Sequence, residues 1–248
     1  MFAIAHAHLM ERIFPERTPM HYLGCAWPDM LFNGPLKHEQ THRECLALLA
    51  RAREHAPELI PFVRAAITHG EEPHGFDWYS DKAYDPGAER GYAFERARPF
   101  VDDVVAATHV PPDIGLWKAH NFVEMSFEIA LGQAYPHLGP MVAAACTDGA
   151  LARATAELAA GYFQVSADEV MRNIIDFPAT VSLDHPTSLT LAQTYAKQLE
   201  LKHGVTDADI PAMAAIIDRV WEAIAPDREA FLEFCVREVA AMIAGIAV

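Results

Sequence analysis

The chain has 248 residues, of which 52% are hydrophobic and 21% are charged, so it can bury a substantial core and is not expected to be disordered. Its 19 Lys and Arg residues against 34 Asp and Glu residues give a net charge of −15, which disfavours general binding to nucleic acids or to an anionic membrane. The four cysteines form no C-x-x-C motif and follow no zinc-site spacing, so we expect reduced and mostly buried thiols.

Helical periodicity dominates the sequence, and no segment shows sustained period-2 alternation of β-branched residues. We therefore predict an all-α, multi-helix bundle. Start signals such as the S-x-x-E of Ser166 and Glu169 support several of the helices. The expected helices cover about 2–13, 37–56, 58–69, 93–108, 113–131, 138–147, 149–160, 167–176, 187–203, 208–224 and 227–245.

Two long irregular stretches, 14–35 and 69–92, interrupt these helices, and loops of that length are more often functional than idle. Of the 13 histidines, ten lie in the first 120 residues, which places the expected chemistry there. We therefore expect a metal-binding helical core over 1–140. A helical extension over 141–248 is expected to pack on it within one globular unit, as scaffold, lid or dimer surface.

The two ends of the sequence carry no targeting or membrane signal. The segment "MFAIAHAHLMERIFPER" lacks the basic region and the apolar stretch of a signal peptide. The C-terminal run "VAAMIAGIAV" is about half a membrane span and is a candidate homodimer surface. These patterns predict a cytoplasmic protein with no membrane span.

The segment "KAHNFVEMSFE" places His120 and Glu124 one helical turn apart, on a stripe shared with Trp117, Phe127 and Leu131. A buried hydrogen-bonded pair would explain the two polar residues. Imidazole nitrogen and carboxylate oxygen are also ordinary zinc ligands, and H-x-x-x-E presents both to one point. The pair is therefore a candidate wall of a metal site.

The segment "KHEQTH" sets His38 and His42 on one helical face. It also spells H-E-x-x-H, in which Glu39 would be the general base of a zinc protease. The residues after the motif, Arg43 and Glu44, are charged, and no sheet is predicted upstream. The context therefore argues against a protease.

Two N-terminal segments add further candidates. In "AWPDM", Asp29 follows a proline in a turn, where it would serve as a helix cap or as a metal ligand on a rigid loop. In "AHAHL", His6 and His8 lie two residues apart on different helix faces, so at most one of them joins a given site.

The segment "ITHGEEPHGFDWYSD" begins where an apolar helix ends at His69 and Gly70. A histidine there is often structural, yet a metal ligand at that junction would be well fixed. His74, Asp77 and Asp81 follow in the glycine-rich loop. Together with the preceding motifs, these placements favour a polynuclear metal site.

The motifs "AHAHLM", "YLGCAWPDM", "KHEQTH", "ITHG" and "KAHNFVEM", in this order, resemble the zinc-dependent phospholipase C family, which is related to fungal single-strand nucleases. The resemblance covers about residues 1–130. It implies an all-α bundle of the phospholipase C and nuclease type, here with additional C-terminal helices. It also implies two or three zinc ions and a bridging hydroxide that attacks a phosphodiester. A weaker similarity to acyl-carrier-protein phosphodiesterases implies the same type of reaction.

The resemblance also implies a role for individual residues. Asp29 would bind a metal and orient the attacking hydroxide, and Asp77 would be a bridging or orienting carboxylate. The implied ligands are His8 (with His6 as the alternative), Asp29, His42 (with His38 as the alternative), His69, His120 and Glu124.

The predicted function is a metal-dependent hydrolase that cleaves a small-molecule phosphodiester or phosphomonoester with a metal-bound hydroxide. Zinc is the expected metal, although mixed His and carboxylate ligands also accept manganese or iron. The alternatives are an H-E-x-x-H metalloprotease that uses Glu39, and a non-catalytic helical binding protein with a structural metal or none.

Overall fold

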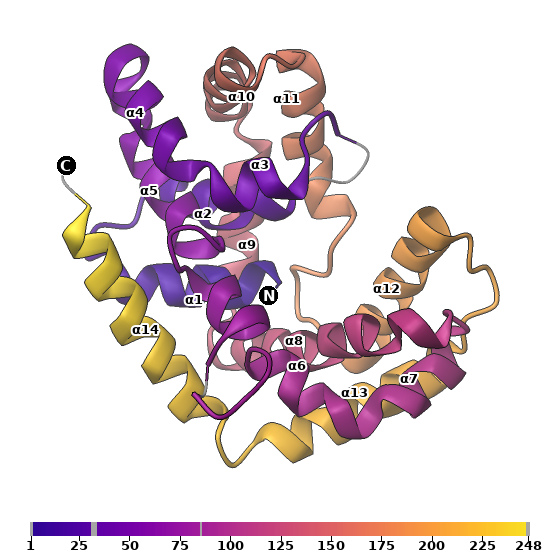
Figure 1. Cartoon of the computed structure of the whole chain (residues 1–248). Helices are drawn as coiled ribbons and strands as arrows, with labels where there is room; N and C mark the ends of the chain where they lie inside the picture. Colours follow the sequence, from indigo (N-terminus) through magenta and orange to yellow (C-terminus); the bar gives the residue numbers. More distant parts are fainter. Residues whose placement is uncertain (1, 31–33, 85, 247–248) are drawn as a thin grey trace.

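The computed structural model describes residues 2–30, 34–84 and 86–246, and it is helical throughout, with no strand in these ranges. The all-α, multi-helix prediction is therefore confirmed (Figure 1). The helices are α1 (Ala3–Ile13), α2 (Pro19–Ala26), α3 (His38–Arg43), α4 (Cys45–His55), α5 (Ile60–His69), α6 (Tyr92–Ala97), α7 (Val101–Thr108), α8 (Gly115–Ala134), α9 (Leu138–Thr147), α10 (Gly149–Phe163), α11 (Ala167–Asp176), α12 (Ser188–His203), α13 (Ile210–Ile224) and α14 (Arg228–Gly245).

Helix α8 lies at the centre of the fold and is buried on nearly all sides, because α1, α6, α7, α12 and α13 pack against it. The buried carboxylate of Glu128 on α8 accepts hydrogen bonds from the backbone nitrogens of Ile4 (3.1 Å) and Ala5 (2.8 Å). These are N–H groups of the first turn of α1, which has no earlier carbonyl to bond them. Glu128 thus fixes the N-terminal turn of α1 against α8.

Helix α2 and the 3₁₀ turn Trp27–Asp29 lie within the stretch 14–35, which the sequence predicts to be irregular. Pro19 begins the helix, and Thr18 N donates to His21 Nδ1 over 3.3 Å. Helix α2 packs closely on α5, since a Cβ at Gly24 would lie 2.1 Å from the carbonyl oxygen of Phe62. This close approach brings Asp29 beside the end of α5.

The predicted helix 37–56 is divided into α3 and α4 at Glu44. The division has a physical cause, because the carbonyl oxygen of His42 accepts from the backbone nitrogens of Glu71 (2.8 Å) and Glu72 (3.0 Å) instead of continuing the helix. The approach requires Gly70, where a Cβ would lie 2.4 Å from that oxygen. The end of α3 is therefore docked on the loop that follows α5.

The predicted loop 69–92 contains a short π-helix at Trp78–Lys82. Its last residue is anchored by an ion pair between Lys82 Nζ and Glu71 Oε1 (3.2 Å), and the same glutamate binds Arg43 on α3 (Nη2 to Oε2, 2.7 Å). Single-turn π-helices are rare in proteins, and those that do occur frequently lie at functional sites. Further along, the predicted helix 93–108 is divided into α6 and α7 by a 3₁₀ turn that contains Pro99.

Helices α9, α13 and α14 of the C-terminal half pack on helices of the N-terminal half. Helix α9 contacts α1 and α2, α13 contacts α7 and α8, and α14 lies along α1 and α5 (Figure 1). None of the helices in the described ranges combines the length and apolarity needed to cross a bilayer. The four cysteines are free thiols and are buried, as predicted: Cys25, Cys45, Cys146 and Cys235.

Candidate metal centre

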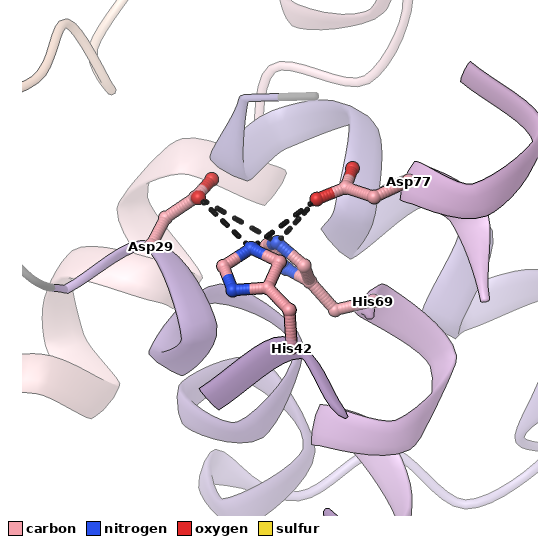
Figure 2. A group of neighbouring side chains, drawn as sticks. All are labelled: Asp29, His42, His69 and Asp77. Atoms are coloured by element: carbon pink, nitrogen blue, oxygen red, sulfur yellow. Dashed lines mark ion pairs between the residues drawn. The ribbon is translucent and has the colours of Figure 1, made fainter. Parts of the chain in front are cut away.

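Four side chains that are distant in sequence converge where α3 and α5 meet the 3₁₀ turn Trp27–Asp29 and the start of the π-helix Trp78–Lys82. We call Asp29, His42, His69 and Asp77 the first group. Figure 2 shows the two carboxylates on either side of the two imidazoles. The Nε2 atom of His69 lies 3.2 Å from Asp77 Oδ2 and 3.6 Å from Asp29 Oδ1. The Nε2 atom of His42 lies 3.4 Å and 3.6 Å from the same oxygens.

The other ring nitrogen of each histidine is held by the backbone. His69 Nδ1 donates to the carbonyl oxygen of Cys25 (2.6 Å), and His42 Nδ1 lies 3.1 Å from the carbonyl oxygen of His38 and 2.9 Å from the hydroxyl oxygen of Thr41. A carbonyl oxygen only accepts, so Nδ1 of His69 carries a hydrogen. This arrangement is typical of metal-binding histidines, in which the outer nitrogen is anchored and the inner one faces the ion.

The charges of the first group are strongly coupled. Burial lowers the pKa of His69, but Asp77 and Asp29 outweigh it and raise that pKa to about 10. Burial likewise opposes protonation of His42, yet bonds to the two aspartates raise its pKa. Burial would raise the pKa of Asp29, but His69 and His42 hold it well below the usual value. The pKa of Asp77 is also held well below the usual value despite burial, and the histidines are among the causes. Without a metal, protons on the imidazoles balance the carboxylates.

The spacing of the first group fits a divalent metal ion. Zinc bonds of about 2.0–2.1 Å at tetrahedral angles place neighbouring ligand atoms about 3.3 Å apart. The nitrogen-to-oxygen separations here are 3.2–3.6 Å. A dication would also replace the imidazole protons, so the spacing of these residues is compatible with a bound metal.

A second group consists of Asp81, His120 and Glu124, each with a ligand atom within 4.8 Å of the others. The buried atoms Asp81 Oδ1 and His120 Nδ1 have no hydrogen-bond partner among the described residues. Buried polar atoms without a partner are costly, and an ion would satisfy both. Burial raises the pKa of Asp81 to about 6 and lowers that of His120 to about 4, so His120 is neutral and can bind a metal at pH 7.

The two groups face one cavity. It has a volume of about 210 Å³ and is lined by residues of both groups: Asp29, His42, Asp77, Asp81, His120 and Glu124. The short π-helix connects them, because Asp77 precedes it and Asp81 lies within it. The arrangement can therefore hold one ion at each group and admit a small polar ligand between α8, α12 and the turns.

Most of the predicted ligands lie in these groups, but His8 does not. Its ring packs against Tyr135, with centroids 4.6 Å apart, outside both groups. His6 is the α1 histidine at the site: its ring stacks on that of His69, with centroids 3.4 Å apart, and its Nε2 lies 3.3 Å from Asp77 Oδ1. The alternative named in the sequence analysis thus replaces the preferred residue.

The H-E-x-x-H motif does not converge on one point. His42 belongs to the first group, whereas His38 lines the cavity but directs Nε2 to Glu71 Oε1 (3.2 Å), with its side chain 49% exposed. Glu39 is exposed and does not line the cavity. Trp117, expected in the buried stripe of α8, is 52% exposed at the cavity wall.

Three residues at the cavity are not among the ligands that the resemblance implies. Asp81 is spaced four residues from Asp77, and this spacing was the available signal. Lys118, only 5% exposed, and Lys202 line the same cavity. Burial lowers the pKa of Lys118 to about 8, and Lys202 acts in the same direction. A buried lysine in this position has no signature in the sequence.

Comparisons with known proteins give no family for this chain. It matches no protein-family model, and no curated protein or solved structure resembles it significantly. The functional argument therefore depends on the chemistry of the two groups.

Proposed function

We propose that the protein is a metal-dependent hydrolase that cleaves small phosphoric esters, in line with the resemblance to the zinc-dependent phospholipase C family. The observation that carries the proposal is the pair of ligand groups on one cavity, in which both histidines of the first group have Nδ1 anchored and Nε2 facing two aspartates. Two ion sites beside a substrate cavity are typical of enzymes that cleave phosphoesters.

Each group has a distinct role. The first group offers four ligands to one ion, and the second offers three to another, which leaves a coordination position for substrate. Divalent ions there would supply positive charge that stabilises phosphoryl oxygens and makes water a stronger acid. We expect zinc, with manganese or iron as alternatives. This charge also explains how a protein with a net charge of −15 would bind an anionic ester.

Asp29 is the residue that we assign to the attacking water. Its side chain is 34% exposed, so it is the most accessible carboxylate of the first group, and it lines the cavity. Although it is partly buried, the neighbouring histidines hold its pKa well below the usual value, so it is ionised at neutral pH and can accept a hydrogen bond from water. Asp77, with one oxygen toward His69 and the other toward His6, positions the ligands.

The two alternatives from the sequence have less support. A zinc protease needs Glu39 at the metal, but this side chain is exposed and outside the cavity. A purely structural metal is ordinarily enclosed by four protein ligands. The second group has three ligands and opens onto a cavity, which favours catalysis.

The proposal is tested on protein purified without a chelator or a metal-affinity tag. We expect about two equivalents of metal by mass spectrometry and metal-dependent hydrolysis of bis(4-nitrophenyl) phosphate or 4-nitrophenyl phosphate. His120→Ala and Asp29→Ala should each reduce the rate by at least about 100-fold. Glu39→Gln should leave the rate within about twofold, and casein should not be cleaved. Less than half an equivalent of metal with no uptake on reconstitution would overturn the proposal.

A further inference from the structure

Glu71 is a buried carboxylate that belongs to neither ligand group and is not part of the described wall of the cavity. Its Oε2 atom accepts from Nε (2.9 Å) and Nη2 (2.7 Å) of Arg43 on α3. Its Oε1 atom lies 3.2 Å from Nε2 of His38, also on α3, and 3.2 Å from Nζ of Lys82, the last residue of the π-helix. One carboxylate thus joins two short elements of the fold.

The elements that meet at Glu71 carry ligands of both groups. Helix α3 carries His42 of the first group, and the π-helix carries Asp81 of the second. Glu71 also follows the end of α5 at His69 by two residues, and its backbone nitrogen donates to the carbonyl oxygen of His42 (2.8 Å). The backbone of Glu71 therefore ties α5 to α3, and its side chain continues this connection to the π-helix.

The burial of Glu71 decides how strong this connection is. The side chains of Arg43 and Lys82 are 42% and 35% exposed, and ion pairs between exposed groups contribute little on their own. The Glu71 side chain is only 3% exposed, and a buried carboxylate that loses its partners is costly. The carboxylate therefore keeps both partners in place. The five-residue π-helix depends on such a contact, because a helix this short is not stable alone.

We propose that Glu71 is a positioning residue that holds the ligands of both groups in place, through Arg43 for the first group and through Lys82 for the second. The inference rests on the proposed function for the presence of an ion at each group. Residues that orient metal ligands without touching the ion contribute about 10–100-fold to metal affinity. Glu71 would do so at two sites at once.

The zinc affinity of the metal-free, full-length protein tests the inference without any substrate. Asp81→Asn disables the second group and isolates the first, and His42→Ala disables the first group and isolates the second. Zinc binding is measured in each background by competition with a chelating dye. Addition of Glu71→Gln, which keeps the size of the side chain but removes its charge, should weaken zinc binding by about tenfold or more in both backgrounds.

The two partners of Glu71 should have separate effects. Arg43→Gln releases α3, so it should weaken zinc binding by about threefold or more at the first group and by less than about twofold at the second. Lys82→Gln releases the end of the π-helix beside Asp81 and should give the reverse pattern. A carboxylate that only stabilised the fold would not produce opposite patterns in these two variants.

Asp227→Asn is the matched control for the loss of a clustered carboxylate. Asp227 accepts from Tyr92 Oη (2.7 Å) and Arg96 Nε (2.8 Å), at the start of α14 and outside the described wall of the cavity. Its substitution should lower the free energy of unfolding in urea but leave zinc affinity at both groups within about twofold. Circular dichroism confirms that each variant is folded.

The outcomes separate this inference from the proposed function. Unchanged zinc affinity at either group in Glu71→Gln, parallel effects of Arg43→Gln and Lys82→Gln, or an equal loss in Asp227→Asn would overturn the inference, even in a protein that hydrolyses nitrophenyl phosphates. The expected losses in a protein that hydrolyses no phosphoester with any metal would support the positioning role and overturn the proposed function alone. A wild-type protein that binds no metal would overturn both.

Discussion

His69 donates its Nδ1 hydrogen to the carbonyl oxygen of Cys25 over 2.6 Å, and this bond directs Nε2 to Asp29 and Asp77. Cys25 lies on α2 and His69 ends α5, so the close packing of these two helices at Gly24 sets the direction of the imidazole. The geometry of the first group is thus a consequence of helix packing.

Metal binding to the first group should release protons. The pKa of His69 is raised to about 10, so in the metal-free protein this imidazole holds a proton throughout the neutral range. The stability that this proton gives is fully present below about pH 6.5 and is lost as the pH rises through about 10. Zinc competes with the proton, so its affinity should increase with pH over the same range.

Calorimetric titration of the metal-free protein with zinc in two buffers of different ionisation enthalpy measures the released protons at pH 7. His69→Ala should remove about one proton from the total and reduce zinc affinity by more than about 100-fold, because residues that only orient a metal ligand already account for 10–100-fold. His8→Ala is the control and should change neither value. Proton release that is the same in wild type and His69→Ala would contradict this account.

The finding that His6, and not His8, lies at the first group gives a second prediction. Both side chains are buried on α1, at 1% and 4% exposure, so their removal should destabilise the fold to a similar extent. Only His6 stacks on His69 and contacts Asp77. We expect His6→Ala to reduce kcat/KM for bis(4-nitrophenyl) phosphate by about 10–100-fold and His8→Ala to leave it within about twofold. Equal losses in the two variants would mean that α1 positions the site only through its overall packing.

The sequence predicts the scaffold of this protein better than its turns. Helices α9 and α11 begin and end at the predicted residues, because apolar periodicity and caps such as Ser166 define them. The break at Glu44 and the π-helix at Trp78–Lys82 were not predicted. Both depend on tertiary bonds to residues distant in sequence, such as those of the His42 carbonyl oxygen and of Glu71.

The candidate site could be predicted only in part, for a related reason. The i, i+4 spacing identifies His120 and Glu124 as a candidate pair of ligands. The sequence does not predict whether His6 or His8 faces the site, because every residue from Ala3 to Met10 is buried and this part of the helix has no exposed face that would show its orientation. The place of Lys118 at a cavity wall depends on α12, which begins 70 residues later in the sequence.

The second group should bind its metal independently of the first. Asp81→Asn keeps the size of the side chain but removes the charge, so we expect it to lose one of two metal equivalents and about 100-fold or more in activity. Glu72→Gln removes the same charge from an exposed position of the preceding turn and should retain both equivalents. Metal content, measured by mass spectrometry after gel filtration, distinguishes the loss of one ion from the loss of both. Loss of both ions in Asp81→Asn, with the fold intact, would show that the groups form one cooperative site.

The contact between Glu128 and the first turn of α1 predicts a pH-dependent stability. Burial raises the pKa of Glu128 to about 8, although the Ile4 and Ala5 amides oppose this change. The native state then binds more protons than the unfolded chain between about pH 4.5 and 8, so stability should decrease with rising pH in this range. The slope for one such group is at most about 1.4 kcal/mol per pH unit.

Glu128→Gln cannot ionise and keeps an oxygen that accepts from one of the two amides. The free energy of unfolding of the wild type minus that of this variant should therefore decrease as the pH rises from 5 to 8, measured by urea denaturation in matched buffers. Glu229→Gln, at an exposed position on α14, is the matched control for the loss of one carboxylate. A difference that is constant or increases with pH in Glu128→Gln would mean that the carboxylate is ionised in the folded protein and caps α1 as an anion.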